Sequence, residues 1–313
     1  MKKKYTKSVL KILLFDNKGT EDIKMNYFLR QCKEVDLLMS KIKLSYVIAT
    51  PELSFNENVT AYQGDISEAF RKLKNLGYDG AELMLVDPKR AEQRKIAHLS
   101  QKYRIEIPVI CTGEVFGQAH LSFMNPDESV RDEAIQRMKD IIDFAKPFGA
   151  KVNIGRLRGR FYPEIPREKS LDWMYFAFND VADYAFEKGV TLILEPIPYV
   201  FCNNINTTQD GIDIVKNVGK ESFKMMVDLF SMHIEDQSLE KSFNEVKPYL
   251  EHIHICDSNR LAPGRGNLDF KKIINIIKNI DYDGYISVEI KQGPDKDIIL
   301  KESIELIKPL LKC

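Results

Sequence analysis

The sequence lacks the features that mark several common classes of protein. It has no apolar run long enough to cross a bilayer, so we expect no membrane-spanning helix. Its 46 basic and 46 acidic residues cancel, so no net charge draws it to nucleic acid or to an anionic membrane surface. Its five cysteines are scattered and form no CxxC pair, a pattern that indicates free thiols in a reducing compartment. We therefore expect a cytoplasmic protein that binds a small molecule, with no nucleic acid and no membrane as partner.

The first 42 residues are expected to be an N-terminal extension outside the fold. The segment MKKKYTKSVLKILLFDNK has a charged start and an apolar patch, as a signal peptide would. Lys11 interrupts that patch, and no small-residue cleavage site follows it. The extension could equally precede a natural start at Met39. A chain of 313 residues that is 44% hydrophobic can form one large α/β domain or two ordinary ones, and we assign residues 43–313 to a single domain.

Short apolar runs alternate with amphipathic segments from residue 43 onward. The runs have the composition of buried strands, whereas the segments between them have apolar residues at three- and four-residue spacing. Such alternation predicts parallel strands covered by helices. Two similar segments, LKNLGYDGAELML and IKNIDYDGYISVEI, suggest duplicated units, and no GxGxxG follows the first run to mark a dinucleotide crevice. Eight units predict a closed, all-parallel (β/α)8 TIM barrel; the predicted strands span residues 44–50, 81–86, 105–111, 151–155, 190–195, 224–228, 252–256 and 285–290.

Four side chains that bind divalent cations recur at one place in these units. Glu195, Asp228, His254 and Glu289 each lie at or near the end of a strand-like run. Barrel enzymes carry their chemistry at the carboxyl ends of the strands, so the four side chains should converge. Any one of them alone could be a helix cap or a surface charge, but three carboxylates beside buried surface are costly without a cation. The sequence therefore predicts a divalent metal site and an enzyme.

The histidines and the kind of metal require separate choices. His252 and His254 alternate onto one face of a strand, and His254 is nearer the carboxyl end, so we expect His252 to be a hydrogen-bonded residue of the barrel interior. His233 follows Asp228 in a predicted loop and could reach the same site. Cys256 should face the interior near the mouth, with at most a minor contribution to the metal. Oxygen ligands with one nitrogen favour Mn²⁺, with Mg²⁺ or Co²⁺ as alternatives, over structural zinc.

The loop after His254 carries a resemblance to a known family. HIHICDSNRLAPGRGNLDF followed by YDGYISVEI, with LEPIP and MVDLF upstream, resembles the xylose isomerase-like TIM-barrel superfamily of sugar isomerases and epimerases. Within it, ketose 3-epimerases and keto-sugar-acid epimerases are the most similar. The resemblance covers roughly residues 43–313. It implies a carbohydrate substrate, with Glu195 and Glu289 as both metal ligands and acid/base groups, Asp228 and His254 completing the metal site, and Arg260 touching substrate oxygens.

Further substrate contacts are predicted from segments that resemble or depart from this family. Arg156 and Arg158 in VNIGRLRGR could meet a carboxylate or phosphate of the substrate, or could be exposed charges on a loop. DLFSMH places Ser231 where a substrate-contacting histidine is usual, with His233 two positions further on. LEPIPYVF places Phe201 where a second glutamate is common. These departures alter the expected contacts to one end of the substrate and leave the four metal ligands in place.

The reaction that we predict is proton transfer next to a carbonyl group. A cation that chelates the carbonyl and hydroxyl oxygens stabilises a cis-enediolate, and Glu195 and Glu289 on opposite faces would remove and return the proton. One alternative is a dehydratase on the same scaffold, which would expel a β-hydroxyl. An endonuclease IV-like hydrolase is less favoured because the chain has only 5 histidines and no net charge, and a non-catalytic sugar-binding protein would not need all four ligands. We expect a homo-oligomer, either a dimer or a tetramer.

Overall fold

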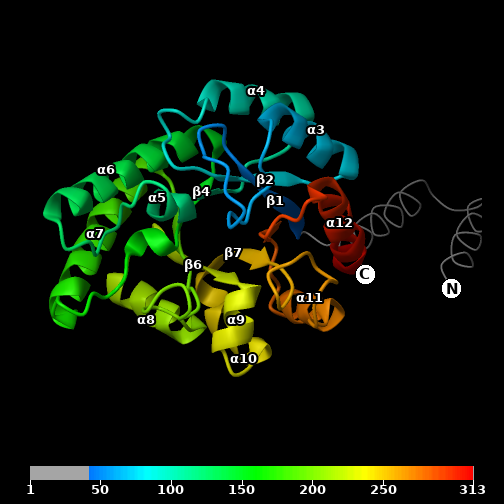
Figure 1. Ribbon diagram of the computed structural model, residues 1–313. Coiled ribbons are helices and arrows are strands. Elements are labelled where there is room, and N and C mark those ends of the chain that lie inside the picture. The colour runs from blue at the N-terminus through cyan, green and yellow to red at the C-terminus, as the bar shows by residue number, and fades with distance from the viewer. Residues whose placement is uncertain (1–41, 313) are drawn as a thin grey trace, which may run out of the picture. The chain divides into compact units, whose positions relative to one another are not determined.

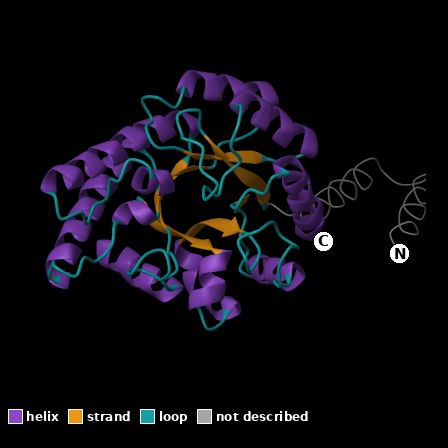
Figure 2. Cartoon of the chain, viewed as in Figure 1, coloured by secondary structure: helices purple, strands orange, loops and turns teal. Residues whose placement is uncertain are grey.

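Eight parallel strands form a closed barrel surrounded by helices (Figure 1, Figure 2). The computed structural model describes residues 42–312, so the predicted extension lies outside the described residues apart from Ile42. Each strand pairs with its neighbours in chain order, and β1 closes the barrel by pairing with β8. The predicted (β/α)8 barrel is confirmed. Its strands are β1 (Lys43–Ala49), β2 (Gly80–Met84), β3 (Val109–Cys111), β4 (Lys151–Ile154), β5 (Leu192–Leu194), β6 (Phe223–Asp228), β7 (Leu250–Ile255) and β8 (Tyr285–Val288).

One or two helices follow each strand. Short additional helices, α5 and α9, begin directly at the mouth of the barrel after β3 and β6. The helices are α3 (Ile66–Leu76), α4 (Gln93–Tyr103), α5 (Gly113–Gly117), α6 (Glu128–Ala145), α7 (Arg167–Lys188), α8 (Thr208–Val218), α9 (Leu229–Glu235), α10 (Leu239–Val246), α11 (Phe270–Asn279) and α12 (Lys296–Lys312), with single 3₁₀ turns at Lys146–Phe148, Arg156–Arg158 and Lys247–Tyr249.

Helix α3 shows how the sequence determines these elements. Asp65 precedes it and accepts a hydrogen bond from the Glu68 main-chain nitrogen at 2.8 Å, which satisfies one of the free N–H groups of the first turn. Its buried face consists of apolar side chains at three- and four-residue spacing, which pack on the barrel. Gly77 ends the helix with φ of 89°, a left-handed conformation that glycine adopts without steric cost.

Several elements differ from the sequence-based expectations, and some of the differences have clear local reasons. Strand β3 begins at Val109 instead of residue 105, because Pro108 has no N–H to donate to the sheet. Helix α4 begins only at Gln93, because the Asp87 carboxylate accepts the Lys89 main-chain N–H and forms a turn before it. The segment after Asp228, predicted as a loop, is helix α9. Every strand nevertheless ends within two residues of its expected end, so the predicted ligands stay at the carboxyl edge of the barrel.

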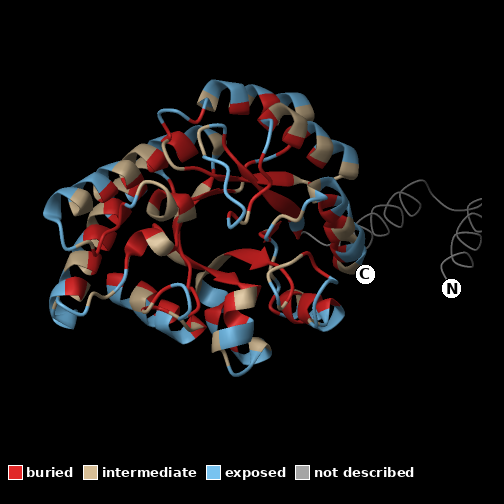
Figure 3. Ribbon diagram, in the orientation of Figure 1, coloured by how far each residue is buried: buried red, intermediate tan, exposed pale blue. Residues whose placement is uncertain are grey.

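The apolar core of the described residues consists of one large cluster and two small ones. The large cluster fills the layer between the barrel and the helices, whose inward faces are buried in Figure 3. Inside the barrel, Val109, Ile193 and Met226 pack together as a separate apolar cluster. Because successive residues of a strand point to opposite faces, the residues two positions further along β5 and β6 are Glu195 and Asp228. These three apolar side chains therefore lie inside the barrel, beneath the predicted site.

Two predictions based on absences concern the described residues. Cys111, Cys202 and Cys256 are buried free thiols, as expected, whereas Cys32 and Cys313 lie outside the described residues. Among residues 42–312, no helix combines the length and apolar character that a bilayer crossing requires.

Candidate metal centre and active site

The four predicted ligands converge at the carboxyl ends of four neighbouring strands. Glu195 follows β5, Asp228 ends β6, His254 lies in β7 and Glu289 follows β8. One ligand atom from each residue lies within 4.8 Å of the others, and all four side chains are buried. Glu195 and Glu289 are far apart in sequence. The barrel brings them together because adjacent parallel strands end at one edge.

The histidine presents an unpaired nitrogen to this cluster. His254 Nδ1 is buried and has no hydrogen-bond partner. It lies 3.5 Å from Glu195 Oε1 and 3.5 Å from Glu289 Oε2. An unpaired buried nitrogen costs free energy, and so do three carboxylates that share one buried space. A divalent cation would remove both costs, and the donor set of carboxylate oxygens with one imidazole fits Mn²⁺, Mg²⁺ or Co²⁺.

Glu195 is oriented by an amide from the neighbouring strand. Asn153 Nδ2 donates to Glu195 Oε2 at 2.8 Å. The amide orientation is fixed in turn, because Asn153 Oδ1 accepts the main-chain N–H of Thr112 at 2.8 Å. One oxygen of Glu195 is therefore held at the barrel wall, and the other, Oε1, faces His254.

Asp228 and Glu289 also divide their oxygens between a structural contact and the cluster. Asp228 Oδ1 accepts the main-chain N–H of Phe230 at 2.7 Å, which caps helix α9, while Oδ2 lies 3.2 Å from Arg260 Nη1. Glu289 Oε1 accepts from the Thr60 hydroxyl at 3.0 Å, and Oε2 lies 2.5 Å from Arg260 Nη2. Arg260 therefore bridges two of the predicted ligands with separate N–H groups.

The loop between β7 and α11 brings Arg260 to this position. Asp257 Oδ1 accepts the main-chain N–H groups of Ser258 at 2.7 Å and Leu268 at 3.1 Å, and its Oδ2 accepts that of Gly264 at 2.8 Å. One buried carboxylate thus ties the two ends of the loop together. Arg260 itself has φ of 60°, and its guanidinium lies 5.0 Å from the centre of the Phe230 ring.

Burial and neighbouring charges set the pKa values in the cluster. Burial raises the pKa of Glu195 and of Asp228, which reflects the cost of ionising both in one space. Burial would also raise the pKa of Glu289, but the charges of Arg260 and His254 overcome it and lower that pKa to about 2. For His254, burial favours the neutral form, yet the carboxylates of Glu82 and Glu289 raise its pKa well above the usual value. The grouping of these carboxylates therefore favours binding of a cation.

Glu82 is a buried partner of the site that the sequence did not reveal. Its Oε1 lies 2.8 Å from His254 Nε2, and its Oε2 lies 2.9 Å from His252 Nε2. The expectation that His252 is a hydrogen-bonded residue of the interior is confirmed. Glu82 stands in AELML within an apolar run, and a charged residue at an inward-facing position of a strand was the available signal.

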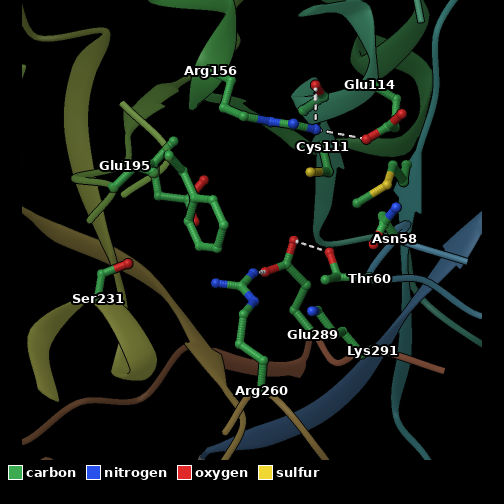
Figure 4. A pocket seen from close by; sticks show the side chains of 14 residues that line it. Asn58, Thr60, Cys111, Glu114, Arg156, Glu195, Ser231, Arg260, Glu289 and Lys291 are labelled. Atoms are coloured by element: carbon green, nitrogen blue, oxygen red, sulfur yellow. Dashed lines mark hydrogen bonds and ion pairs between the residues drawn. The ribbon is translucent and has the colours of Figure 1, made fainter. Parts of the chain in front are cut away.

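A cavity of about 240 Å³ lies above the cluster. Glu195 and Glu289 line it, and so do Arg260, Ser231 and Arg156, three of the five predicted substrate contacts (Figure 4). Arg156 is partly neutralised, because its Nη2 donates to Glu114 Oε1 at 2.6 Å and to the Gly113 carbonyl oxygen at 3.1 Å. Lining residues that sequence reasoning missed come mainly from loops distant in sequence: Asn58, Thr60, Glu114 and Lys291.

The two other predicted contacts do not line this cavity. Arg158 is fully buried, and all five of its N–H groups donate within the protein, to the side chain or main chain of Asn204 and to the carbonyl oxygens of Gly155, Glu195 and Ile205. The structure thus gives it a structural role in place of the predicted substrate contact. His233 is exposed on helix α9, because Asp228 starts a helix where a loop was expected.

Cys256 is not one of the four clustered ligands. Burial, together with the nearby Asp228 carboxylate, raises the pKa of its thiol well above the usual value. A neutral thiol is a weak metal ligand, so the expectation of a minor role fits this environment.

Comparison with known proteins agrees with this architecture. A family model described as xylose isomerase-like TIM barrel matches residues 70–310. A probable ketose 3-epimerase of Synechocystis sp. is 24% identical over 80% of this chain and 89% of its own length. The fructoselysine 3-epimerase of Escherichia coli O157:H7 is 28% identical over 72% of this chain and 85% of its own length.

One further similarity covers a shorter segment, and another covers most of the chain at lower sequence identity. The D-psicose 3-epimerase of Agrobacterium fabrum is 34% identical, but the match spans 37% of this chain and 40% of that protein. The crystal structure of a D-allulose 3-epimerase from Methylomonas sp. superposes with a TM-score of 0.72 at 21% identity, covering 86% of this chain and 96% of that one. At this identity the structural match shows a shared fold.

Proposed function

Because the chain belongs to the xylose isomerase-like TIM barrel family, we propose that it is a metal-dependent epimerase or isomerase of a keto-sugar, a keto-sugar acid or a sugar phosphate. The family match and the relatives support the assignment of the chain to the carbohydrate isomerases and epimerases. The relatives named above act on ketoses or on a ketose derivative, by their names, which supports a carbonyl-bearing sugar as the substrate class.

One observation carries the metal dependence. His254 Nδ1 is buried without a hydrogen-bond partner and faces two carboxylates at 3.5 Å. A nitrogen in that position can serve as a ligand, whereas a purely structural histidine would pair both of its nitrogens. The residues that would hold the ion are Glu195, Asp228, His254 and Glu289. A divalent ion there would polarise the substrate carbonyl and stabilise the enediolate that forms on proton loss.

The residues of the chain then supply proton transfer and orientation. Glu195 and Glu289 approach from strands β5 and β8 and both line the cavity, so a sugar held between them meets one carboxylate on each face. One glutamate removes the proton from the carbon next to the carbonyl, and the other returns a proton to the opposite face, which inverts that centre. Arg260, Ser231 and Arg156 line the same cavity and orient substrate oxygens.

Three finer predictions accompany this proposal. Mn²⁺ is the metal that we expect, which the mixed oxygen and nitrogen donor set supports. A cytoplasmic location is supported by the three buried free thiols among the described residues. A homo-oligomer is supported by the large apolar side chains Phe176 and Phe186, which are 67% and 63% exposed on helix α7.

Solvent deuterium exchange tests the proposed reaction. The protein is incubated in D₂O with ketoses, keto-sugar acids and ketose phosphates, once with Mn²⁺ and once with EDTA. We expect one deuterium to enter at one carbon of a preferred substrate, with no loss of water, and EDTA to suppress the exchange. Loss of water from the product would instead indicate the dehydratase. Absence of exchange with every compound in the presence of Mn²⁺ would contradict the proposal.

A further inference from the structure

A single carboxylate in the barrel interior joins both histidines of strand β7. Glu82 lies on β2, which is separated from β7 by β1 and β8 around the closed sheet, so the contact crosses the interior. Its two oxygens lie 2.8 Å from His254 Nε2 and 2.9 Å from His252 Nε2. The Glu82 side chain is 0% exposed and each histidine side chain is 1% exposed. Buried polar side chains of this kind are stable in a protein interior only when their hydrogen bonds are satisfied.

We propose that Glu82 is a positioning residue for the metal centre, acting through His254. A carboxylate only accepts hydrogen bonds, so its contact keeps a hydrogen on His254 Nε2. In the neutral ring that binds a metal ion, the other nitrogen, Nδ1, then carries the lone pair, and it is this atom that faces Glu195 and Glu289. Glu82 thus determines which nitrogen of His254 is offered to the cation and fixes the plane of the ring.

His252 completes this support by fixing the carboxylate. A carboxylate that contacted His254 alone could rotate about its terminal bond and weaken the hydrogen bond. The second oxygen of Glu82 is held by His252, whose ring is nearly perpendicular to that of His254, at 84° and with centres 5.4 Å apart. The two histidines therefore grip one carboxylate from different directions. Removal of either histidine would leave part of a buried charge without a partner.

The same three residues could be considered a second metal site, because they also meet a distance criterion for one. The geometry instead favours a hydrogen-bonded group that orients His254. Oxygen-to-nitrogen separations of 2.8 Å and 2.9 Å are hydrogen-bond lengths, and both Nε2 atoms are already committed to Glu82. A metal ion there would have to displace both hydrogen bonds in a space that is closed to solvent. The inference therefore predicts one ion per chain.

Metal binding by a Glu82→Gln variant tests the inference, which rests on the proposed metal site. Glutamine keeps the size of the side chain but offers one acceptor and one donor, so it cannot accept from both histidines. We expect Mn²⁺ affinity to fall by about 10- to 100-fold, with one ion per chain in the parent and an unchanged circular dichroism spectrum. The matched control is Ser45→Ala, which removes the interior hydrogen bond to Ser287 at 2.5 Å without touching a ligand; its affinity should equal that of the parent.

A second measurement tests the role of Glu82 with a readout that requires neither metal binding nor catalysis. Nitrogen-15 NMR of the histidine side chains in the metal-free parent should show the hydrogen of His254 on Nε2, and Glu82→Gln should disturb that signal. A parent with the hydrogen only on Nδ1 would overturn the inference, even if Glu82→Gln fails to fold. So would a folded Glu82→Gln that binds Mn²⁺ as tightly as the parent, or a parent that binds two ions. If the parent binds one Mn²⁺ but exchanges no ketose, the proposed function fails while the Glu82 result still decides this inference.

Discussion

Arg158 Nη1 donates a hydrogen bond to the main-chain oxygen of Glu195 at 2.8 Å, so a fully buried guanidinium holds the end of strand β5 in place. The same nitrogen also donates to the Gly155 carbonyl oxygen at 3.0 Å, which links the ends of β4 and β5. A cation that does not line the cavity thus stabilises the main chain beneath a predicted ligand, whose side chain is held separately by Asn153.

We expect Arg158→Lys to lower stability much more than it changes substrate binding. Lysine cannot reproduce the five-donor fork of arginine, and the carbonyl groups left unpaired each cost about 1–3 kcal/mol. A decrease of about 3 kcal/mol or more in the free energy of unfolding, measured with urea, is the expected result. The KM of the folded fraction should stay close to that of the parent. A variant of normal stability with a greatly raised KM would restore Arg158 as a substrate contact.

Glu195→Gln and Glu289→Gln should each nearly abolish turnover. Glutamine retains the shape of the side chain but cannot accept a proton, and a positioned acid or base contributes about 10²- to 10⁴-fold to the rate. Glu106→Gln is the control, because Glu106 pairs with Lys43 at 2.7 Å near the start of β1, at the other end of the barrel. Rates of deuterium exchange measure the effect. Retention of parental turnover by either of the first two variants would show that its carboxylate moves no proton.

The loop that carries Arg260 should lose stability in acid through Asp257. Burial alone would raise the pKa of Asp257, but the main-chain N–H groups of its loop lower it overall. A carboxyl group with a lowered folded pKa stabilises the protein above its unfolded pKa, near 3.9, and this contribution is lost as pH falls through the folded value. We expect Asp257→Asn to be about 1.5–3 kcal/mol less stable than the parent at pH 7.

The difference between parent and Asp257→Asn should shrink as the pH is lowered below about 4. Urea unfolding at a series of pH values measures it. A difference that stays constant across this range would mean that the charge of Asp257 does not support the loop.

Lys291 should favour a substrate that carries a negative charge. Among the cavity-lining cations, Arg156 is paired with Glu114, and Arg260 with Asp228 and Glu289, whereas Lys291 has no acidic partner within residues 42–312. We expect a ketose phosphate or keto-sugar acid to have a KM about tenfold below that of the neutral sugar, a difference of about 1.4 kcal/mol. Lys291→Met should remove this preference and leave the KM of the neutral sugar unchanged. Equal KM values in the parent would contradict the expectation.

The barrel and the convergence of its ligands could be predicted because both follow from local pattern. The β-branched runs and helical spacing specify the strands, and parallel strands in a barrel must end at one edge. Glu195, Asp228, His254 and Glu289 occupy equivalent places in their units, so sequence position alone brings them together. The convergence of these four side chains does not depend on the conformation of the loops.

The remaining contacts depend on packing between distant segments. Arg158 follows a strand as a loop charge would, and its burial depends on carbonyl groups of Asn204 and Ile205, more than 40 residues away. His233 lies on helix α9 because the Asp228 carboxylate caps that helix, a role that its place at a strand end does not reveal. Glu82 stands in an apolar strand pattern, and only the closed barrel shows that it faces two histidines.

Anomalous diffraction from crystals soaked in Mn²⁺ tests the metal centre most directly. We expect one strong manganese peak per chain, within about 2.0–2.3 Å of an oxygen of Glu195, Asp228 and Glu289 and of Nδ1 of His254. The same soak of His254→Ala crystals should show the barrel intact and the peak greatly weakened. No peak between these four side chains, or a peak of equal strength in the variant, would contradict the proposed metal site and the reaction that depends on it.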